Sequence, residues 1–235
     1  MIGMRTENLS NNLSGISIPA SWLSILAAIV ALIFLASLHI LSPEYDPSFR
    51  MVSEYANGHY PFILILMFIS WAISSWALAF AIRSQLKTRA GKLGLIFLII
   101  AGIGEAMGGI FNINHDILHG IAGALGIFGL PVAAILISVN ITRNQAWLAS
   151  RKALLMAANF TWIIIVLLII SFAVMIAEVM QSGVTVNPKA PVLPPGVIAL
   201  VGWADRLLIV IYCLWVMMTA WKAIKLKKQQ INDTI

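Results

Sequence analysis

The sequence has one cysteine and few charged residues, and both shortages narrow the possible classes of protein. Cys213 lies inside an apolar run and has no second cysteine to pair with, so the chain forms no intrachain disulfide. Only 10% of the 235 residues are charged, whereas a soluble domain usually carries about 25%. The chain is also 60% hydrophobic. Its apolar runs are long enough to cross a lipid bilayer, which predicts an all-α, multi-pass membrane protein.

Apolar runs recur along the chain and predict a bundle of six transmembrane helices. The predicted spans cover about residues 21–41, 61–82, 93–111, 119–138, 153–179 and 196–220. We assign them to a single transmembrane domain, 20–224, because the sequence shows no internal repeat. Residues 1–19 are polar and are expected to form a flexible cytoplasmic tail, and 225–235 to form a basic cytoplasmic tail.

Lysine and arginine residues concentrate in the tails and in two loops, 83–92 and 143–152, on one side of the predicted bundle. Only Arg50, Lys189 and Arg206 lie elsewhere. The positive-inside rule therefore places both termini in the cytoplasm of a protein of the plasma membrane. An excess of lysine and arginine in the loops of a membrane protein reflects its orientation in the membrane, so we expect no nucleic-acid partner.

The opposite side of the bundle gathers the other ionisable groups. It holds all four histidines and every acidic residue except Glu7 and Asp233. Such groups are costly in lipid, so those near the spans are expected to face the bundle interior and to pair or function. This predicts a polar pocket that opens to the extracytoplasmic side. The residues expected to line it are His39, Glu105, His115, Asp116, Asp205 and Arg206.

The third and sixth spans place two opposite charges at similar depth. At 1.5 Å per residue, Glu105 lies about 10 Å below the outer surface and Arg206 about 15 Å or less. We therefore expect Arg206 to face a carboxylate, with Glu105 as the first candidate. The two residues either form a structural ion pair that joins the helices or bind an anionic head group.

The first extracytoplasmic loop, 42–60, is predicted to hold a short helix. Asp46 can cap its N-terminus, with Pro47 at the first helical position, and Asn57 would end it.

Three residues on the outer side are candidate catalytic groups. Ser53 and Glu54 lie in the first extracytoplasmic loop, and His119 begins the fourth span. Ser53 and Glu54 can act as a nucleophile and an acid-base group. Alternatively, they satisfy backbone groups or close the mouth of the bundle.

Two histidines at the start of the fourth span have the spacing of metal ligands. His115 and His119 lie four residues apart, on one face of a helix that begins there, with Asp116 between them. With His39 or a carboxylate as a third ligand they can hold zinc with a water in an open fourth position, which suits a hydrolase. The alternative is that Asp116 or Asn114 caps the helix and the histidines form hydrogen bonds.

Three segments together resemble the domain-of-unknown-function 998 family of prokaryotic proteins. They are His39-Ile-Leu-Ser-Pro43-Glu-Tyr-Asp46-Pro47 followed by Ser53-Glu54-Tyr-Ala, then His115-Asp-Ile-Leu-His119-Gly120, and Gly202-Trp-Ala-Asp-Arg206. The resemblance covers nearly the whole chain and implies six spans without an assigned reaction. It points to His39, Ser53, Glu54, His119 and Arg206. Asp116 departs from the glycine expected there.

Two classes of function fit these patterns. The first is a protein that binds a lipid head group or a small ligand in the outward pocket, within the lipid bilayer. The alternative is a membrane-embedded, possibly zinc-dependent lipid hydrolase with its site on the outer side. A transporter or channel needs polar groups along its full path, whereas the cytoplasmic halves of the predicted spans carry no charge.

Overall fold

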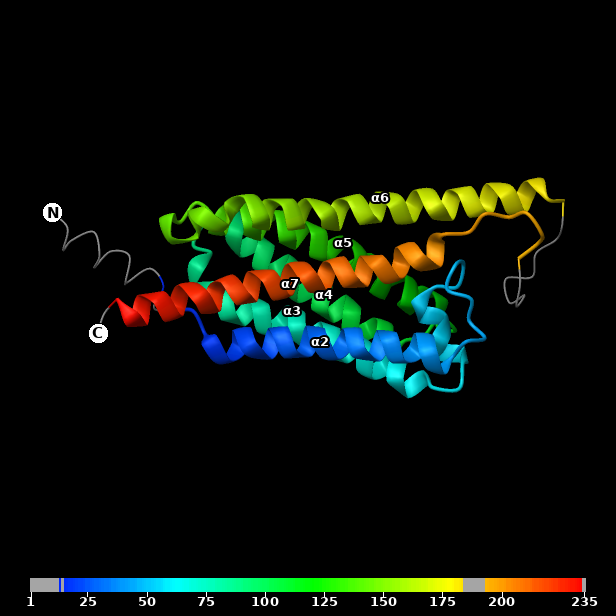
Figure 1. The fold of residues 1–235 in the computed structure, drawn as a ribbon, viewed down its shortest axis with the longest axis horizontal. Coiled ribbons are helices and arrows are strands. Elements are labelled where there is room, and N and C mark those ends of the chain that lie inside the picture. Colours follow the sequence, from blue (N-terminus) through cyan, green and yellow to red (C-terminus); the bar gives the residue numbers. More distant parts are fainter. Residues whose placement is uncertain (1–12, 14, 184–192, 234–235) are drawn as a thin grey trace.

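The structure, a computed structural model, describes residues 13, 15–183 and 193–233 and folds them into a helical bundle. Six helices are long and apolar enough to cross a membrane. They are α2 (Ile18–Leu41), α3 (Pro61–Ile82), α4 (Arg89–Ile110), α5 (Asp116–Ile141), α6 (Arg151–Gln181) and α7 (Val201–Asn232). The described residues contain no strand, so the predicted all-α fold class with six spans is confirmed (Figure 1).

Local signals start these helices at the edges of the apolar runs. The Ser17 side chain accepts a hydrogen bond from the backbone of α2, and Thr88 Oγ1 accepts one from Gly91 N at 2.9 Å in α4. Pro61 is the first residue of α3, where its missing N–H is not needed. Between these ends only a helix satisfies every backbone polar group inside lipid.

Some helix boundaries differ from the predicted spans. α5 begins at Asp116 rather than 119, and α7 begins at Val201 rather than 196. α7 then continues to Asn232, so most of the predicted basic tail, 225–235, is helical. Hydropathy falls at charged residues, but Lys and Gln are good helix formers and prolong the helix into water. The predicted tail 1–19 lies mostly outside the described residues.

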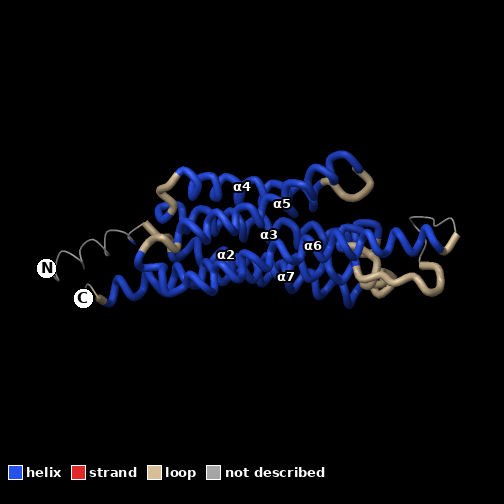
Figure 2. The backbone as a smooth tube through the Cα atoms, turned by 90° about the horizontal axis from the view of Figure 1, so that it is seen from above, coloured by secondary structure: helices blue, strands red, loops and turns tan. Residues whose placement is uncertain are grey.

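The helices pack in a closed ring, and α3 and α7 also contact each other across it. Each helix packs against the next along the chain, and α2 packs against α7. Figure 2 shows the α4–α5 hairpin on one side of the bundle, α2 and α7 on the other, and α3 between them. The closest approach within the hairpin is at Gly104, where an added Cβ would lie 2.4 Å from Gly126 N. The backbones of α4 and α5 therefore lie against each other at this point.

The two ends of the bundle differ in their connecting segments and in the charged residues buried near them. We call the end with residues 42–60 and 111–115 the loop end, and the end where α2 begins and α7 finishes the tail end (Figure 1). Short 3₁₀ helices, η2 (Arg83–Gln85) and η3 (Gln145–Ser150), lie at the tail end. The charged residues that the described chain buries, Glu105, Asp205 and Arg206, all belong to the half nearer the loop end.

Candidate functional site

The segment between α2 and α3 folds over the loop end of the bundle. It contains a 3₁₀ helix, η1 (Val52–Asn57), which ends at the predicted residue but begins later than Asp46. Asp46 Oδ1 instead accepts a hydrogen bond from Ser48 N at 2.9 Å and holds a local turn. The side chains of Val52 and Tyr55 are each 1% exposed, so η1 is anchored in the bundle.

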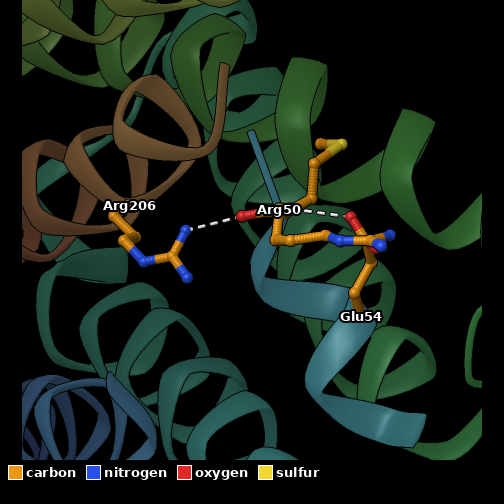
Figure 3. A network of polar contacts seen from close by, with 4 residues as sticks. Arg50, Glu54 and Arg206 are labelled. Atoms are coloured by element: carbon orange, nitrogen blue, oxygen red, sulfur yellow. Dashed lines mark hydrogen bonds and ion pairs between the residues drawn. The ribbon is translucent and has the colours of Figure 1, made fainter. Parts of the chain in front are cut away.

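The first turns of α7 hold this segment largely through its backbone. Asp205 Oδ2 accepts a hydrogen bond from Val52 N at 2.8 Å. Arg206 donates from Nη1 to the Arg50 carbonyl and from Nη2 to the Tyr55 hydroxyl, both at 2.7 Å. Figure 3 shows the Arg206 guanidinium reaching toward the Arg50 carbonyl. We call this set of contacts the α7 clamp.

A glycine on α7 lets the loop backbone approach closely enough for the α7 clamp. Gly202 N donates to the Ser48 carbonyl at 3.0 Å. A Cβ at Gly202 would lie 2.5 Å from the carbonyl oxygens of both Pro47 and Arg50. Contacts that short do not occur, so any side chain here would push the loop away from α7.

Glu54 shapes the loop locally. Its Oε1 accepts a hydrogen bond from Met51 N at 2.9 Å, and its Oε2 pairs with Arg50 Nη1 (Figure 3). These contacts cap the start of η1. Glu54 is not among the residues that line the cavity described below.

The predicted ion pair between Arg206 and Glu105 is wrong. Arg206 is engaged by the loop, whereas both carboxylate oxygens of Glu105 lie near Ser75 Oγ, at 2.9 and 3.2 Å. Side chains on a helix tilt toward its N-terminus. α4 begins at the tail end, so Glu105 reaches away from the loop end and toward the middle of α3. The estimate of depth from the sequence ignored this tilt.

A cavity lies beneath η1, between α3, α4, α5 and α7. Four of the residues singled out from the sequence line it together: Ser53, Glu105, His119 and Asp205. The cavity measures about 90 Å³ as the space open to the centre of a water-sized sphere. One water needs roughly 10–15 Å³ on that measure, so the cavity has room for several waters or a compact chemical group.

Three polar groups at this cavity have no hydrogen-bond partner among the described residues. They are the Trp71 indole N–H, which is fully buried, and the Ser53 hydroxyl and Nε2 of His119, which belong to half-buried residues. Trp71 is only 4% exposed. His119 Nδ1 lies 2.8 Å from the Phe111 carbonyl, which can only accept, so Nδ1 carries a proton and Nε2 is the acceptor of the neutral ring. Buried polar groups are normally satisfied by protein, water or ligand.

The other predicted pocket residues lie outside the cavity. His39 is exposed on α2, and its ring centroid lies 5.5 Å from that of Trp203. His115 is exposed and pairs with Asn112 Oδ1 at 3.1 Å. Asp116 is exposed at the first position of α5, where a carboxylate stabilises the helix dipole.

Arg206 and the predicted zinc ligands are likewise not gathered at the cavity. Arg206 is buried in the α7 clamp and does not line the cavity. Of His39, His115 and His119, only His119 does. No three His, Cys, Asp or Glu side chains in the described part of the chain are arranged to hold a metal ion. Zinc therefore stays a prediction.

The aromatic wall of the cavity was not predicted from the sequence. Phe68 and Trp71 both line it, and their rings stack with centroids 6.2 Å apart and an interplanar angle of 21°. A signal was available, because Trp71 and Ser75 lie four residues apart and so share a face of α3. That face meets Glu105.

The chain was also compared with known proteins. No curated protein and no solved structure matches it. Residues 25–222 match the family described as "Protein of unknown function (DUF998)". This range includes every segment on which the resemblance in the sequence depends. The chain therefore belongs to the DUF998 family of proteins of unknown function.

Proposed function

We propose that this protein binds a lipid head group or a small ligand in the cavity at its loop end. The observation that carries the proposal is the set of unpartnered polar groups around one cavity, from Ser53, Trp71 and His119. Polar groups inside a membrane protein are costly unless something completes their hydrogen bonds. A ligand that replaces water in the cavity would supply those bonds.

The proposal includes the orientation of the bundle in the plasma membrane. The basic loops 83–92 and 143–152 lie at the tail end, together with the lysine-rich end of α7. By the positive-inside rule both termini are cytoplasmic. The cavity then faces the extracytoplasmic side, and a ligand reaches it past Met51 and Ser53 of the first loop.

Two glycines on α5 provide a matched pair of variants. Gly123 lines the cavity, and a Cβ there would meet no atom closer than 4.0 Å. Gly120 has no atom within 4 Å of its Cβ position, and it does not line the cavity. Gly123→Leu should therefore fill the cavity, whereas Gly120→Leu should leave it open with the same change in composition.

Native mass spectrometry of the protein purified in mild detergent tests the proposal. We expect a bound lipid or small molecule on the wild type and on Gly120→Leu, and its loss from Gly123→Leu. Equal occupancy in all three proteins would contradict the proposal, as would the absence of any bound species from the wild type.

A membrane-embedded lipid hydrolase is the second candidate, because Ser53 and His119 line the same cavity. Nε2 of His119 is an acceptor, as a general base requires, and the Ser53 hydroxyl is not engaged elsewhere in the described chain. A fluorophosphonate probe should then label the wild type and Gly120→Leu, but not Ser53→Ala or His119→Ala. An unlabelled wild type would reject a serine nucleophile.

The predicted zinc belongs to the hydrolase candidate. Metal analysis of the purified protein tests it directly, and any bound zinc should be lost from His119→Ala. Zinc that remains in His119→Ala would be bound elsewhere.

A further inference from the structure

Glu105 is a buried acid that forms no ion pair with any described residue. It is 2% exposed, and its only hydrogen-bond donor is the Ser75 hydroxyl. A hydroxyl has one proton to give, so most of the acceptor capacity of the carboxylate is unused. A carboxyl group buried in a membrane either stays protonated or ionises beside a cation. The ionised form of Glu105 therefore needs a positively charged occupant of the cavity.

The wall beside Glu105 is aromatic. Phe68 and Trp71 line the same cavity, and their rings stack on one another. The face of an aromatic ring attracts cations, and Trp does so most strongly. The unpartnered Trp71 N–H can also donate to an oxygen atom of the occupant. An acid next to aromatic rings is a setting that suits an ammonium group and its attached methyl or methylene groups.

The nearest buried cation, Arg206, attracts the Asp205 carboxylate but does not itself line the cavity. Asp205 also lines the cavity, and its Oδ2 accepts a hydrogen bond from Val52 N. Arg206 is the next residue on α7, but its guanidinium is hydrogen-bonded to Arg50, Gly202 and Tyr55 in the clamp, outside the cavity lining. The ionisable lining therefore consists of two acids and one imidazole, with neither lysine nor arginine.

We propose that the occupant is a compact ammonium ion, with its nitrogen between Glu105 and the Phe68–Trp71 pair. Its chemistry is that of choline or ethanolamine, supplied either as a lipid head group or as a free amine. This inference rests on the proposed function, because it names the class of ligand for the same cavity. A small volume and an acid without a counter-ion distinguish this ligand class from phosphate or a neutral sugar.

The first experiment compares a cation with its neutral isostere. The full chain is placed in nanodiscs of phosphatidylglycerol, which lacks an amine, and titrated calorimetrically with choline, ethanolamine and 3,3-dimethyl-1-butanol. We expect choline to bind about 10- to 100-fold more tightly than the neutral alcohol, the range that one charge-assisted contact supplies. Equal affinities for the two, or no binding of choline, ethanolamine or amine lipid, would overturn the inference.

Variants assign the preference to the cavity. Glu105→Gln keeps the shape of the side chain and an acceptor for Ser75, and it should reduce the affinity for choline to that of the neutral alcohol. Trp71→Leu should weaken choline binding as well, and it serves as the second variant if Glu105→Gln does not fold. Gly120→Leu should bind as the wild type does. Unchanged choline affinity in a folded Glu105→Gln or Trp71→Leu protein would overturn the inference.

A second arm identifies the source of the amine. Nanodiscs that contain phosphatidylcholine, phosphatidylethanolamine and phosphatidylglycerol are opened in native mass spectrometry. Retention of the two amine lipids identifies a lipid head group, and binding of free amines alone identifies a soluble ligand. Both outcomes support the inference, whereas selective retention of phosphatidylglycerol would overturn it.

Failure of this inference can be separated from failure of the proposed function. A bound species that is neutral or anionic and is lost from Gly123→Leu leaves the cavity as a binding site but rejects the ammonium. If Gly123→Leu binds everything that the wild type binds, the cavity is not the binding site and both ideas fail.

Discussion

The two ends of the bundle are joined by different chemistry. At the tail end, neutral side chains connect the helices, as in the hydrogen bonds from Trp215 Nε1 to Ser138 Oγ at 3.1 Å and from Thr88 Oγ1 to Asn140 Oδ1 at 2.8 Å. Toward the loop end the buried polar groups include the charged side chains of Glu105, Asp205 and Arg206. Neutral hydrogen bonds and close packing are enough to associate helices in lipid. The charged groups are therefore not required for bundle formation as such, and they call for another explanation.

Those charged groups divide into two kinds. Asp205 and Arg206 hold the first loop against α7. Glu105 holds no loop and faces a cavity with one hydroxyl as its partner. The comparison therefore separates residues that attach the loop from a residue that remains available to a ligand. The following predictions test this division, from the largest expected effect to the smallest.

Arg206→Met should have the largest effect on stability. It removes the bonds to Arg50 and Tyr55, and each hydrogen bond to a charged group contributes about 1.5–3 kcal/mol, so we expect a loss of about 3 kcal/mol in the free energy of unfolding. Denaturant unfolding in mild detergent measures it, and hydrogen exchange in residues 50–57 should rise. Arg89→Met, exposed at the tail end, is the control and should stay within about 0.5 kcal/mol. Equal losses would contradict the division.

Gly104→Ala should separate α4 from α5. The new methyl group would lie 2.4 Å from Gly126 N, and overpacking of this kind typically costs about 1–3 kcal/mol. Gly120→Ala is the matched control, because its methyl group meets no atom within 4 Å and alanine favours a helix. The midpoint of thermal unfolding should fall for Gly104→Ala alone. A lower midpoint in both variants would show that helix contact is not the cause.

Ser138→Ala should weaken the tail end without affecting the cavity. It leaves the buried Trp215 N–H without its partner, for an expected loss of about 1 kcal/mol. Thermal unfolding measures the loss, and native mass spectrometry should show unchanged ligand occupancy. Ser37→Ala is the control, because Ser37 bonds only to its own helix at an exposed position. A loss of ligand from Ser138→Ala would contradict the separation of the two ends.

Acid should loosen the loop slightly through Asp46. The hydrogen bond from the Ser48 backbone lowers the pKa of Asp46 below its ordinary value of 3.8. A lowered pKa stabilises the folded loop above pH 3.8, and this contribution is lost as pH falls through the folded value. Hydrogen exchange at residues 46–50, corrected for its intrinsic pH dependence, should therefore rise below pH 3.8. Asp46→Asn should abolish that rise, and an unchanged rise would assign it to another group.

The sequence predicted features that depend on local pattern. Apolar runs predicted the six spans, and an acid inside such a run predicted that Glu105 faces the interior. The partner of Arg206 was not predictable in this way, because it is a backbone carbonyl 156 residues away. Every residue carries such a carbonyl, so no side-chain pattern marks the one that is bound. The same holds for Val52 N, which donates a hydrogen bond to Asp205 Oδ2.

The α7 clamp has a consequence for substitutions in the lining of the cavity. Asp205 and Gly202 form hydrogen bonds with backbone groups of the loop. Arg206 donates to a backbone carbonyl and to one side-chain hydroxyl of the loop. The identities of Met51 and Ser53, which face the cavity, do not enter these bonds. Substitution of these two side chains would therefore change the lining of the cavity while the loop keeps the same anchorage. The shape of the cavity and the attachment of the loop are specified by different atoms.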